Sequence, residues 1–404
     1  MENNKPKIRF KDYKETWEQR KLGEVAKFSK GRGYSKNDLT EEGTPIILYG
    51  SLYTNYQTVI NDVSTFTVDK DNSVYSLGNE VVVPSSGESA EDIARASAII
   101  NKGIILGGDL NIIHSNNNIN PIFLALLISN GERKIELAKK AQGKSVVHLY
   151  NTDLEELNLI YPNREEQTRI SDFFNSIDHL ITLHQRKLEL LKEYKKTMLR
   201  KMFPKDGENV PEIRFDGFSD DWEQCKLGEV GETFNGLSGK TKEDFGKGDA
   251  EFVTYLNVFN NSLSNINLTE NVEVDIKQHE VKFGDIFFTT SSETPEEVGM
   301  SSIWLDNRPN VYLNSFCFGL RPTLNIDPYY VAYMLRSSGI RRQFILLAQG
   351  ISRYNISKIK AMEIKILLPK LDEQREIGSF FINLDNLITL HQRKLDSLEK
   401  QKKY

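Results

Sequence analysis

The chain has 404 residues, of which 39% are hydrophobic and 27% are charged, and its formal net charge is −5. This composition is typical of a folded protein of two to three domains and excludes collagen-like, low-complexity and wholly disordered chains. No apolar run approaches the ~18 residues of a membrane-spanning helix, and the first residues form no hydrophobic signal segment. The two cysteines, Cys225 and Cys317, are too few for a disulfide framework or a cysteine-based zinc site, so we expect a cytoplasmic protein.

The strongest feature of the sequence is an internal repeat. The segment WEQRKLGEV at residues 17–25 recurs as WEQCKLGEV at residues 222–230, and LITLHQRKL at residues 180–188 recurs letter for letter at residues 387–395. The residues between these anchors differ strongly in the two copies. A retained framework around a divergent middle indicates a tandem duplication, whose two modules present different binding surfaces on one scaffold.

Each divergent middle is predicted to be a mixed module of helices and strands. In the first copy, strand-like runs such as EVVVP (residues 80–84) and GIILGG (residues 103–108) are separated by Gly, Asn and Ser, and a helix follows Pro121. The second copy repeats this order with DIFFTT (residues 285–290) and a helix after Pro328. The predicted fold class is therefore α+β, with two tandem globular α/β modules.

A long helix is predicted to follow each module. From Ile170 and again from Ile377, apolar residues recur at alternating steps of four and three, which is the spacing of a coiled-coil seam. The first helix is expected to run over residues 166–203, between Pro162 and Pro204. Such helices cannot bury their stripes alone, so we expect them to pair as an antiparallel coiled coil with the modules at its opposite ends. The predicted seam residues are Ile177, Ile181, His184, Leu188, Leu191, Leu384, Ile388, His391, Leu395 and Leu398.

Polar residues also fall in this seam. His184 and His391 occupy equivalent positions and are interpreted as residues that set the register, with a metal or catalytic role as the alternative. Lys195 and Lys402 are expected to extend out of the seam into solvent. The predicted boundaries are 1–160 for the first module, 161–204 for the first helical arm, 205–367 for the second module and 368–404 for the second arm.

Positive charge is clustered although the chain as a whole is acidic. Residues 133–150 contain five basic residues and one acid, and residues 336–360 contain six basic residues and no acid. Because the clusters occupy matching places in the two copies, they favour contacts with nucleic-acid phosphates, with a solvated helix face as the alternative.

Loops beside these clusters are the candidate readers of DNA bases. They are the Gly-rich stretches at residues 29–36 and 234–242, the loops at 85–92 and 291–297, and the segment 352–358, which supply hydrogen-bonding and stacking side chains. The candidate DNA-contacting residues are Lys30, Arg32, Tyr34, Ser35, Lys36, Ser85, Ser86, Glu88, Ser89, Lys144, Ser145, Ser238, Lys240, Thr241, Lys242, Ser291, Ser292, Glu293, Thr294, Arg341, Arg342, Ser352, Arg353, Tyr354 and Asn355.

Acidic pairs in two of these loops also invite a metal or nuclease interpretation, but helix capping explains them better. Thr294 to Glu297 has the pattern of a capping box with proline at the first helical position, and Ser89 to Asp92 is a weaker equivalent. No metal-binding residues are therefore predicted.

Motifs of catalysis or cofactor binding are not found in the sequence. Residues 143–145 and 239–241 are similar to P-loop endings, but Ala138 and Phe234 stand where the motif requires glycine. No dinucleotide fingerprint, HExxH or GxSxG motif occurs. We therefore expect a non-catalytic chain without catalytic or cofactor-binding residues of its own.

In its duplicated segments the chain resembles the specificity subunit of type I restriction–modification enzymes. The resemblance spans nearly the whole chain and rests on the order of PKIRF…WEQRKLGEV, GDIFFTTSSETPEEVG, QGISRYNISK and LPKLDEQREIGSFFINLDNLITLHQRKLDSL. It implies that each module is a target recognition domain for one half of a bipartite DNA target. The coiled coil would set the spacer and dock two methyltransferase subunits, and restriction and translocase subunits would join them. S-adenosylmethionine, ATP and Mg would be bound by these partners, so this chain would need no cofactor.

Two other functions stay open at this point. One is a self-sufficient DNA methyltransferase or nuclease with degenerate motifs, which the absent cofactor loop opposes. The other is a coiled-coil scaffold that binds proteins, which the matching basic clusters oppose.

Overall fold

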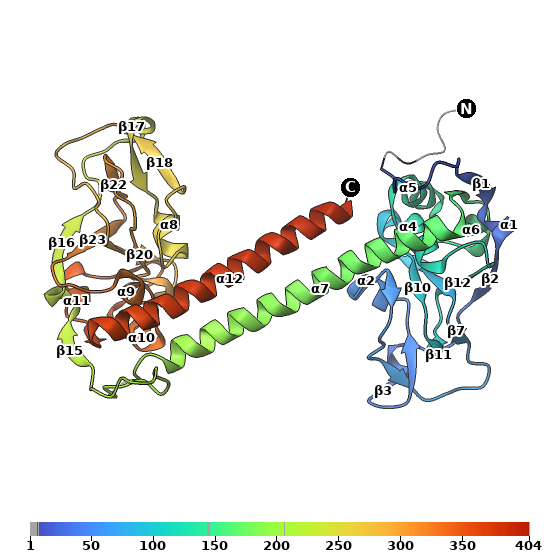
Figure 1. Cartoon of the computed structure of the whole chain (residues 1–404), viewed down its shortest axis with the longest axis horizontal. Helices are drawn as coiled ribbons and strands as arrows, with labels where there is room; N and C mark the ends of the chain where they lie inside the picture. Colours follow the sequence, from blue (N-terminus) through green and yellow to red (C-terminus); the bar gives the residue numbers. More distant parts are fainter. Residues whose placement is uncertain (1–5, 7, 144–145, 206, 404) are drawn as a thin grey trace. The chain divides into compact units, whose positions relative to one another are not determined.

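The computed structural model describes residue 6 and residues 8–143, 146–205 and 207–403. The chain divides into two compact units, Met1–Thr182 with Leu398–Tyr404, and Leu183–Ser397. Each unit contains one globular module and parts of the two long helices (Figure 1).

The first unit is built on antiparallel and parallel strand pairs around a buried central strand. One sheet has the order β2-β12-β8-β10-β5 and another the order β3-β6-β4-β11-β7. The elements are β1 (Glu18–Lys21), α1 (Leu22–Val25), β2 (Ala26–Lys30), η1 (Lys36–Asp38), β3 (Leu39–Thr40), β4 (Thr44–Ile47), α2 (Ser51–Thr54), β5 (Val59–Ile60), β6 (Phe66–Thr67), β7 (Tyr75–Leu77), β8 (Glu80–Pro84), β9 (Ser86–Gly87), α3 (Ala90–Ile93), β10 (Ser97–Ile99), β11 (Lys102–Leu106), β12 (Leu110–Ser115), α4 (Pro121–Ser129), α5 (Gly131–Lys140), β13 (Val147–His148), α6 (Asn151–Glu155) and β14 (Asn158–Tyr161).

Strand β8 shows why the first sheet forms where the sequence predicts it. Its residues EVVVP are all buried, because the strand lies between β12 and β10 and has core side chains on both faces. Glu80 is tolerated there since its carboxylate accepts hydrogen bonds from the backbone N–H groups of Leu77, Gly78 and Asn79. Helix α4 begins at Pro121 as predicted, and the Asn120 side chain caps it.

The second unit repeats this plan with different side chains. One sheet has the order β16-β23-β19-β21 and another the order β18-β17-β22. The elements are β15 (Glu223–Lys226), η2 (Leu227–Glu229), β16 (Gly231–Asn235), η3 (Lys242–Asp244), β17 (Phe245–Val253), α8 (Tyr255–Asn260), β18 (Thr269–Val272), β19 (Ile286–Thr289), β20 (Ser291–Ser292), η4 (Pro295–Glu297), β21 (Ser301–Ile303), β22 (Val311–Leu313), β23 (Cys317–Pro322), α9 (Pro328–Met334), α10 (Ser338–Leu347), β24 (Tyr354–Asn355), α11 (Lys358–Met362) and β25 (Lys365–Leu368). The α+β prediction is confirmed.

Helix capping differs from the prediction in one of the two loops. Ser89 accepts a hydrogen bond from the N–H of Asp92 and caps α3, as expected. Thr294 precedes η4, but its side chain makes no capping hydrogen bond, so the capping box predicted there is wrong. The physical reason is that the proline-initiated segment forms only a short 3₁₀ turn, closed through the Thr294 carbonyl rather than through its hydroxyl.

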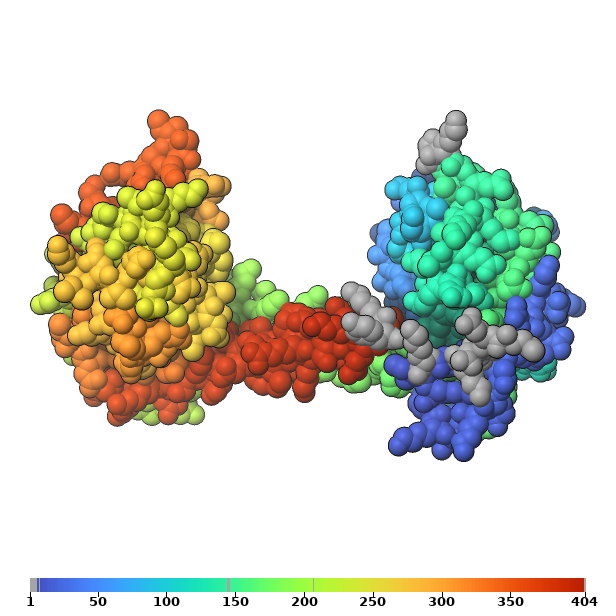
Figure 2. Space-filling view, turned by 90° about the horizontal axis from the view of Figure 1, so that it is seen from above, coloured from blue at the N-terminus to red at the C-terminus, as the bar shows by residue number. Residues whose placement is uncertain are grey.

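The two long helices are α7 (Arg164–Lys201) and α12 (Leu371–Lys403). Helix α7 begins and ends two residues earlier than predicted, and Gly207 follows in the left-handed region at φ 84°. Within the second unit α12 (red) lies alongside α7 (green) in both views (Figures 1 and 2). Two contacts there run in opposite chain directions, from Lys195 to Asp385 and from His184 to His391, so the pairing is antiparallel, as predicted.

The same interactions attach each module to the start of its long helix. In the first unit Arg9 forms a bidentate ion pair with the buried Glu166, and Gln167 accepts a hydrogen bond from the N–H of Asn120. In the second unit the equivalent contacts are Arg214 with Glu373 and Gln374 with the N–H of Asp327. The retained framework of the sequence is therefore the set of residues that hold each module on its helix.

Candidate nucleic-acid interface

A groove of about 960 Å³ opens beside β9 in the first unit. It brings together two loops that the sequence names as candidate base readers, the Gly-rich stretch with Tyr34 and Lys36 and the loop with Glu88. Tyr53 and Arg95, which the sequence does not single out, complete its wall. The groove therefore combines stacking, basic and acidic side chains in one surface.

The Gly-rich loop is fixed by close backbone approaches. A Cβ atom on Gly31 would lie 1.9 Å from the carbonyl oxygen of Gly107, so only glycine fits there. Tyr34 is held in the left-handed region at φ 57°, and its hydroxyl lies 2.6 Å from the Ser73 Oγ. Lys70 lies over the Tyr34 ring, with its Nζ 4.7 Å from the ring centroid. The tyrosine is thus presented on a rigid loop.

The loop after β8 has Glu88 at its tip, and contacts fix it on both sides of this residue. Tyr53 donates a hydrogen bond from its hydroxyl to the carbonyl of Ser86 at 2.8 Å, and burial raises the pKa of that phenol. Beyond the tip, Asp92 binds Ser89 and forms an ion pair with Arg95, whose guanidinium lies against the ring of Tyr53. The pKa of Asp92 is lowered, first by the hydrogen bond from Ser89.

The second unit builds the equivalent loop in the same way. The Tyr255 hydroxyl donates to the carbonyl of Ser291 at 2.7 Å, and β20 pairs with β24, which carries Tyr354 and Asn355. The structure thus places two of the predicted reader segments, residues 291–297 and 352–358, side by side.

Many of the predicted DNA-contacting residues are exposed in the structure. The exposed set is Lys30, Arg32, Ser35, Lys36, Glu88, Ser238, Thr241, Lys242, Glu293, Thr294, Arg342, Ser352, Arg353 and Asn355, while Tyr34, Ser89, Lys240 and Tyr354 are half-buried. Lys144 and Ser145 lie outside the described residues. DNA contact at these positions stays a prediction.

Several of the predicted residues, some of them exposed, make contacts that serve the fold. The serines at residues 85, 86, 291 and 292 are buried, and those at 86, 291 and 292 take part in the short β9–β13 and β20–β24 pairings. Lys240 forms an ion pair with Asp275 at 3.0 Å, and its hydrogen bond is the main cause that lowers the Asp275 pKa to about 2. Ser35 and Thr241 each bind an aspartate of the following 3₁₀ helix.

Arg341 and its neighbour Arg336 also serve the fold. Arg341 donates to the carbonyl oxygens of Glu296, Val298 and Gly299, and Arg336 donates to those of Val258, Phe259, Asn261 and Ser301. Burial lowers the pKa of each guanidinium to about 10, so both stay charged at neutral pH. These contacts favour a structural role for Arg341 over the predicted phosphate contact.

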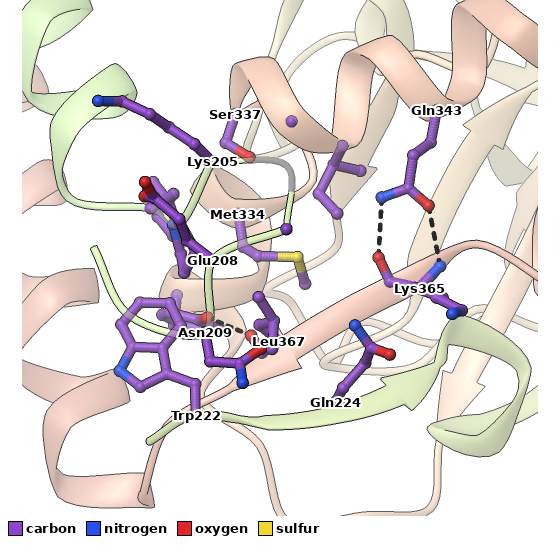
Figure 3. Close-up of a pocket in the computed structure, with 16 residues that line it drawn as sticks. Lys205, Glu208, Asn209, Trp222, Gln224, Met334, Ser337, Gln343, Lys365 and Leu367 are labelled. Atoms are coloured by element: carbon purple, nitrogen blue, oxygen red, sulfur yellow. Dashed lines mark hydrogen bonds between the residues drawn. The ribbon is translucent and has the colours of Figure 1, made fainter. Parts of the chain in front are cut away.

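A cavity of about 390 Å³ lies in the second unit where the chain leaves α7 and enters the module. Trp222 forms part of its wall, and Figure 3 shows the Gln343 amide joined to the Lys365 backbone by hydrogen bonds in both directions. The polar groups of the Gln343 side chain are therefore satisfied within the chain.

The seam between the long helices contains polar contacts at positions that are equivalent in the two copies of the repeat. His184 and His391 lie with their Nδ1 atoms 2.8 Å apart, and Lys195 forms an ion pair with Asp385 at 2.6 Å in the second unit. In the first unit Lys402 forms the equivalent pair with Asp178 at 2.5 Å. The prediction that both lysines extend into solvent is therefore wrong, because a carboxylate on the other helix lies within reach of each.

The histidine pair predicts a pH-dependent stability. A hydrogen bond between two imidazoles requires one neutral ring, and the pKa of His391 is lowered by burial, then by His184, Lys394 and Lys187. A lowered pKa in the folded state means that stability is complete above the ordinary value of 6.5 and falls as the pH falls below it. We expect the melting temperature to drop as the pH is lowered from about 6.5 to about 5.

Two variants distinguish the effect of the histidine pair on the melting temperature from the effect of other titrating groups. The double substitution His184→Leu and His391→Leu should remove most of the drop, as measured by circular dichroism melts across the same pH range. His179→Leu changes an exposed histidine of the same helix and should leave the drop in place. An unchanged pH profile in the double variant would contradict the assignment.

The described residues contain neither a membrane-spanning helix nor a metal-binding cluster. In that part of the chain no helix is both long and apolar enough to cross a bilayer. The same residues include no group of three or more His, Cys, Asp or Glu side chains arranged to hold a metal ion.

Comparisons with known proteins agree with this architecture. The family model described as type I restriction modification DNA specificity domain matches residues 14–193 and again residues 219–400. The MjaVIII specificity subunit of a type I restriction enzyme from Methanocaldococcus jannaschii is 23% identical, over 96% of this chain and 91% of that protein. The putative MjaX specificity subunit from the same organism is 24% identical, over 100% of this chain and 94% of that protein.

Solved structures show the same fold. The S subunit of a type I restriction–modification system from M. genitalium superposes with a TM-score of 0.57 at 15% identity, covering 96% of this chain and 94% of that one. A chain from a structure of the type I R-M system that addresses complex assembly and conformational transition gives a TM-score of 0.51 at 16% identity, covering 96% and 95%. With both copies of its repeat matched by the family model, the chain belongs to the family of type I restriction modification DNA specificity domains.

Proposed function

We propose that this chain is the sequence-specificity subunit of a type I restriction–modification complex and has no catalytic activity of its own. Each module acts as a target recognition domain, the first within residues 1–160 and the second within residues 205–367, and each recognises one half of a bipartite DNA target. The observation that carries this proposal is a loop that recurs in both modules, at residues 85–92 and 291–297, which we call the reader loop. A tyrosine hydroxyl holds it in each unit, from Tyr53 in the first and from Tyr255 in the second, but the surrounding side chains differ.

The helical arms, residues 161–204 and 368–404, are proposed to dock two methyltransferase subunits. Leu180 and Leu183 on α7 are exposed, and so are their repeat equivalents Leu387 and Leu390 on α12. Equivalent apolar positions on two paired helices suit two copies of one partner. Restriction and translocase subunits, S-adenosylmethionine, ATP and Mg belong in this proposal to the partners, and the complex works in the cytoplasm.

Co-expression with the methyltransferase subunit tests the function directly. The modified bases are mapped across the genome of the host cell. The proposal expects methylation at a split sequence of two defined parts separated by a fixed spacer. Methylation by the purified chain alone, given DNA and a labelled methyl donor, would support the enzyme alternative and overturn the proposal.

The docking surface carries its own prediction. Leu180→Asp with Leu387→Asp should abolish co-purification of the methyltransferase subunits, because a carboxylate buried in an apolar contact costs several kcal/mol. Both leucines are exposed in this chain, so the helix content and melting temperature should stay unchanged. The control Gln185→Asp changes an exposed polar residue and should leave assembly intact. Normal co-purification with the double variant would exclude this surface.

A further inference from the structure

An exposed glutamate stands at the tip of the reader loop in both units. Glu88 follows β9 and Glu293 follows β20, and the two positions are equivalent in the repeat. Both side chains are exposed, and among the described residues neither makes a hydrogen bond or ion pair. The carboxylate of each is therefore available to a ligand.

The backbone around each glutamate is held firmly. On one side of Glu88, Ser86 is fixed by the Tyr53 hydroxyl and by the pairing of β9 with β13. On the other side, Ser89 caps α3. Around Glu293, the Tyr255 hydroxyl and the pairing of β20 with β24 fix the preceding residues in the same manner. A preorganised carboxylate can select a ligand group because little freedom is lost on binding.

The negative charge of the two glutamates favours contact with DNA bases over contact with DNA phosphates. A carboxylate is repelled by phosphates, so an unpaired glutamate on a DNA-binding face weakens affinity unless it contacts a base. Basic residues stand close by, with Lys36 and Arg95 in the wall of the first groove and Arg353 before β24 in the second unit. Lys36 and Arg353 are exposed and can bind the phosphate backbone of the DNA while the glutamate faces a base edge.

The hydrogen-bond donors and acceptors on the base edges in the major groove determine which base a carboxylate can bind. A carboxylate only accepts hydrogen bonds, and the adenine and guanine edges carry the N7 acceptor, which repels it. Cytosine offers the N4 amino donor without an adjacent acceptor of its own. We propose that Glu88 and Glu293 each read a cytosine through its N4 amino group, one in each half of the target. This inference rests on the proposed function and adds one specificity-determining residue in each domain.

The test uses the full chain co-expressed with its methyltransferase subunit, with modified sites mapped genome-wide. Glu88→Ala should make one C·G position of one half-site degenerate, reducing the preference for that base pair by about tenfold, and should leave the other half-site intact. Glu293→Ala should do the same in the opposite half-site. Glu91→Ala and Glu296→Ala change exposed glutamates at equivalent positions just beyond each tip and should leave every position unchanged.

The outcomes separate the two proposals. A wild-type chain that yields no bipartite motif defeats the proposed function itself. A bipartite motif that stays unchanged at every position in both alanine variants, or a degenerate position that is an A·T pair, overturns the glutamate inference alone. Should alanine abolish methylation in an intact complex, Glu88→Gln decides, since glutamine keeps an acceptor and pairs with adenine through N6 and N7. The inference then expects C and A to be accepted, and a strict requirement for C overturns it.

Discussion

Replacing Arg336 with methionine is expected to lower the free energy of unfolding of the second unit by about 3–5 kcal/mol. The guanidinium joins the carbonyl oxygens of four residues from two segments, the end of α8 and strand β21. Methionine fills a similar volume but donates no hydrogen bond, so these partly buried carbonyl oxygens lose the guanidinium as their partner. Lysine would restore the charge without the planar fork and should recover only part of the stability.

Chemical denaturation followed by circular dichroism measures this effect. Arg353→Met is the matched control, because Arg353 is exposed and its loss should change the unfolding free energy by less than ~0.5 kcal/mol. The two variants also separate folding from recognition: Arg353→Met should weaken DNA binding by a stable protein and flatten its salt dependence. Equal stability of Arg336→Met and the wild type would show that the buried network contributes little.

Transplanting the second module into the first framework should give a target with two identical halves. Residues 236–362 would replace residues 31–155, which keeps β1, α1, β2 and β14 of the first unit and the ion pair of Arg9 with Glu166. The N–H of Asp327, which contacts Gln374 in the second unit, would take the place of the Asn120 N–H beside Gln167. If each module reads its half-site independently, the original first half-site disappears and the second half-site sequence occurs twice in the methylated target.

The reciprocal transplant, residues 31–155 in place of 236–362, is the control and should duplicate the first half-site. Co-purification with the methyltransferase subunit shows that each chimaera still assembles. A chimaera that assembles and methylates a site in which both halves differ from the parental halves would contradict modular recognition.

The sequence predicts the architecture well because its strongest signals are local. The four–three spacing of apolar residues identifies the two long helices, and the run EVVVP identifies a strand buried on both faces. Pro121 and Pro328 mark helix starts because proline suits the first turn. Duplication strengthens each of these signals, since it presents the same pattern twice.

The candidate interface is harder to predict because exposure depends on distant partners. Ser86 and Ser291 are buried by pairing with β13 and β24, which lie about sixty residues further along the chain. Arg336 is taken up by carbonyls from two other segments, which no local pattern shows. The tyrosines behind the reader loops were missed as well, although their recurrence before each loop is visible in the sequence.

The seam contacts have a consequence for the origin of the chain. The pairs Lys195–Asp385 and Lys402–Asp178 are the same pair with the roles of the two copies exchanged, and the histidine pair is its own counterpart. A single copy of the repeat therefore already contains both sides of every one of these contacts, so two identical copies would supply the complete set. Once two copies are fused in one gene, their sequences can change independently. Each module could then evolve to recognise a different half of the DNA target.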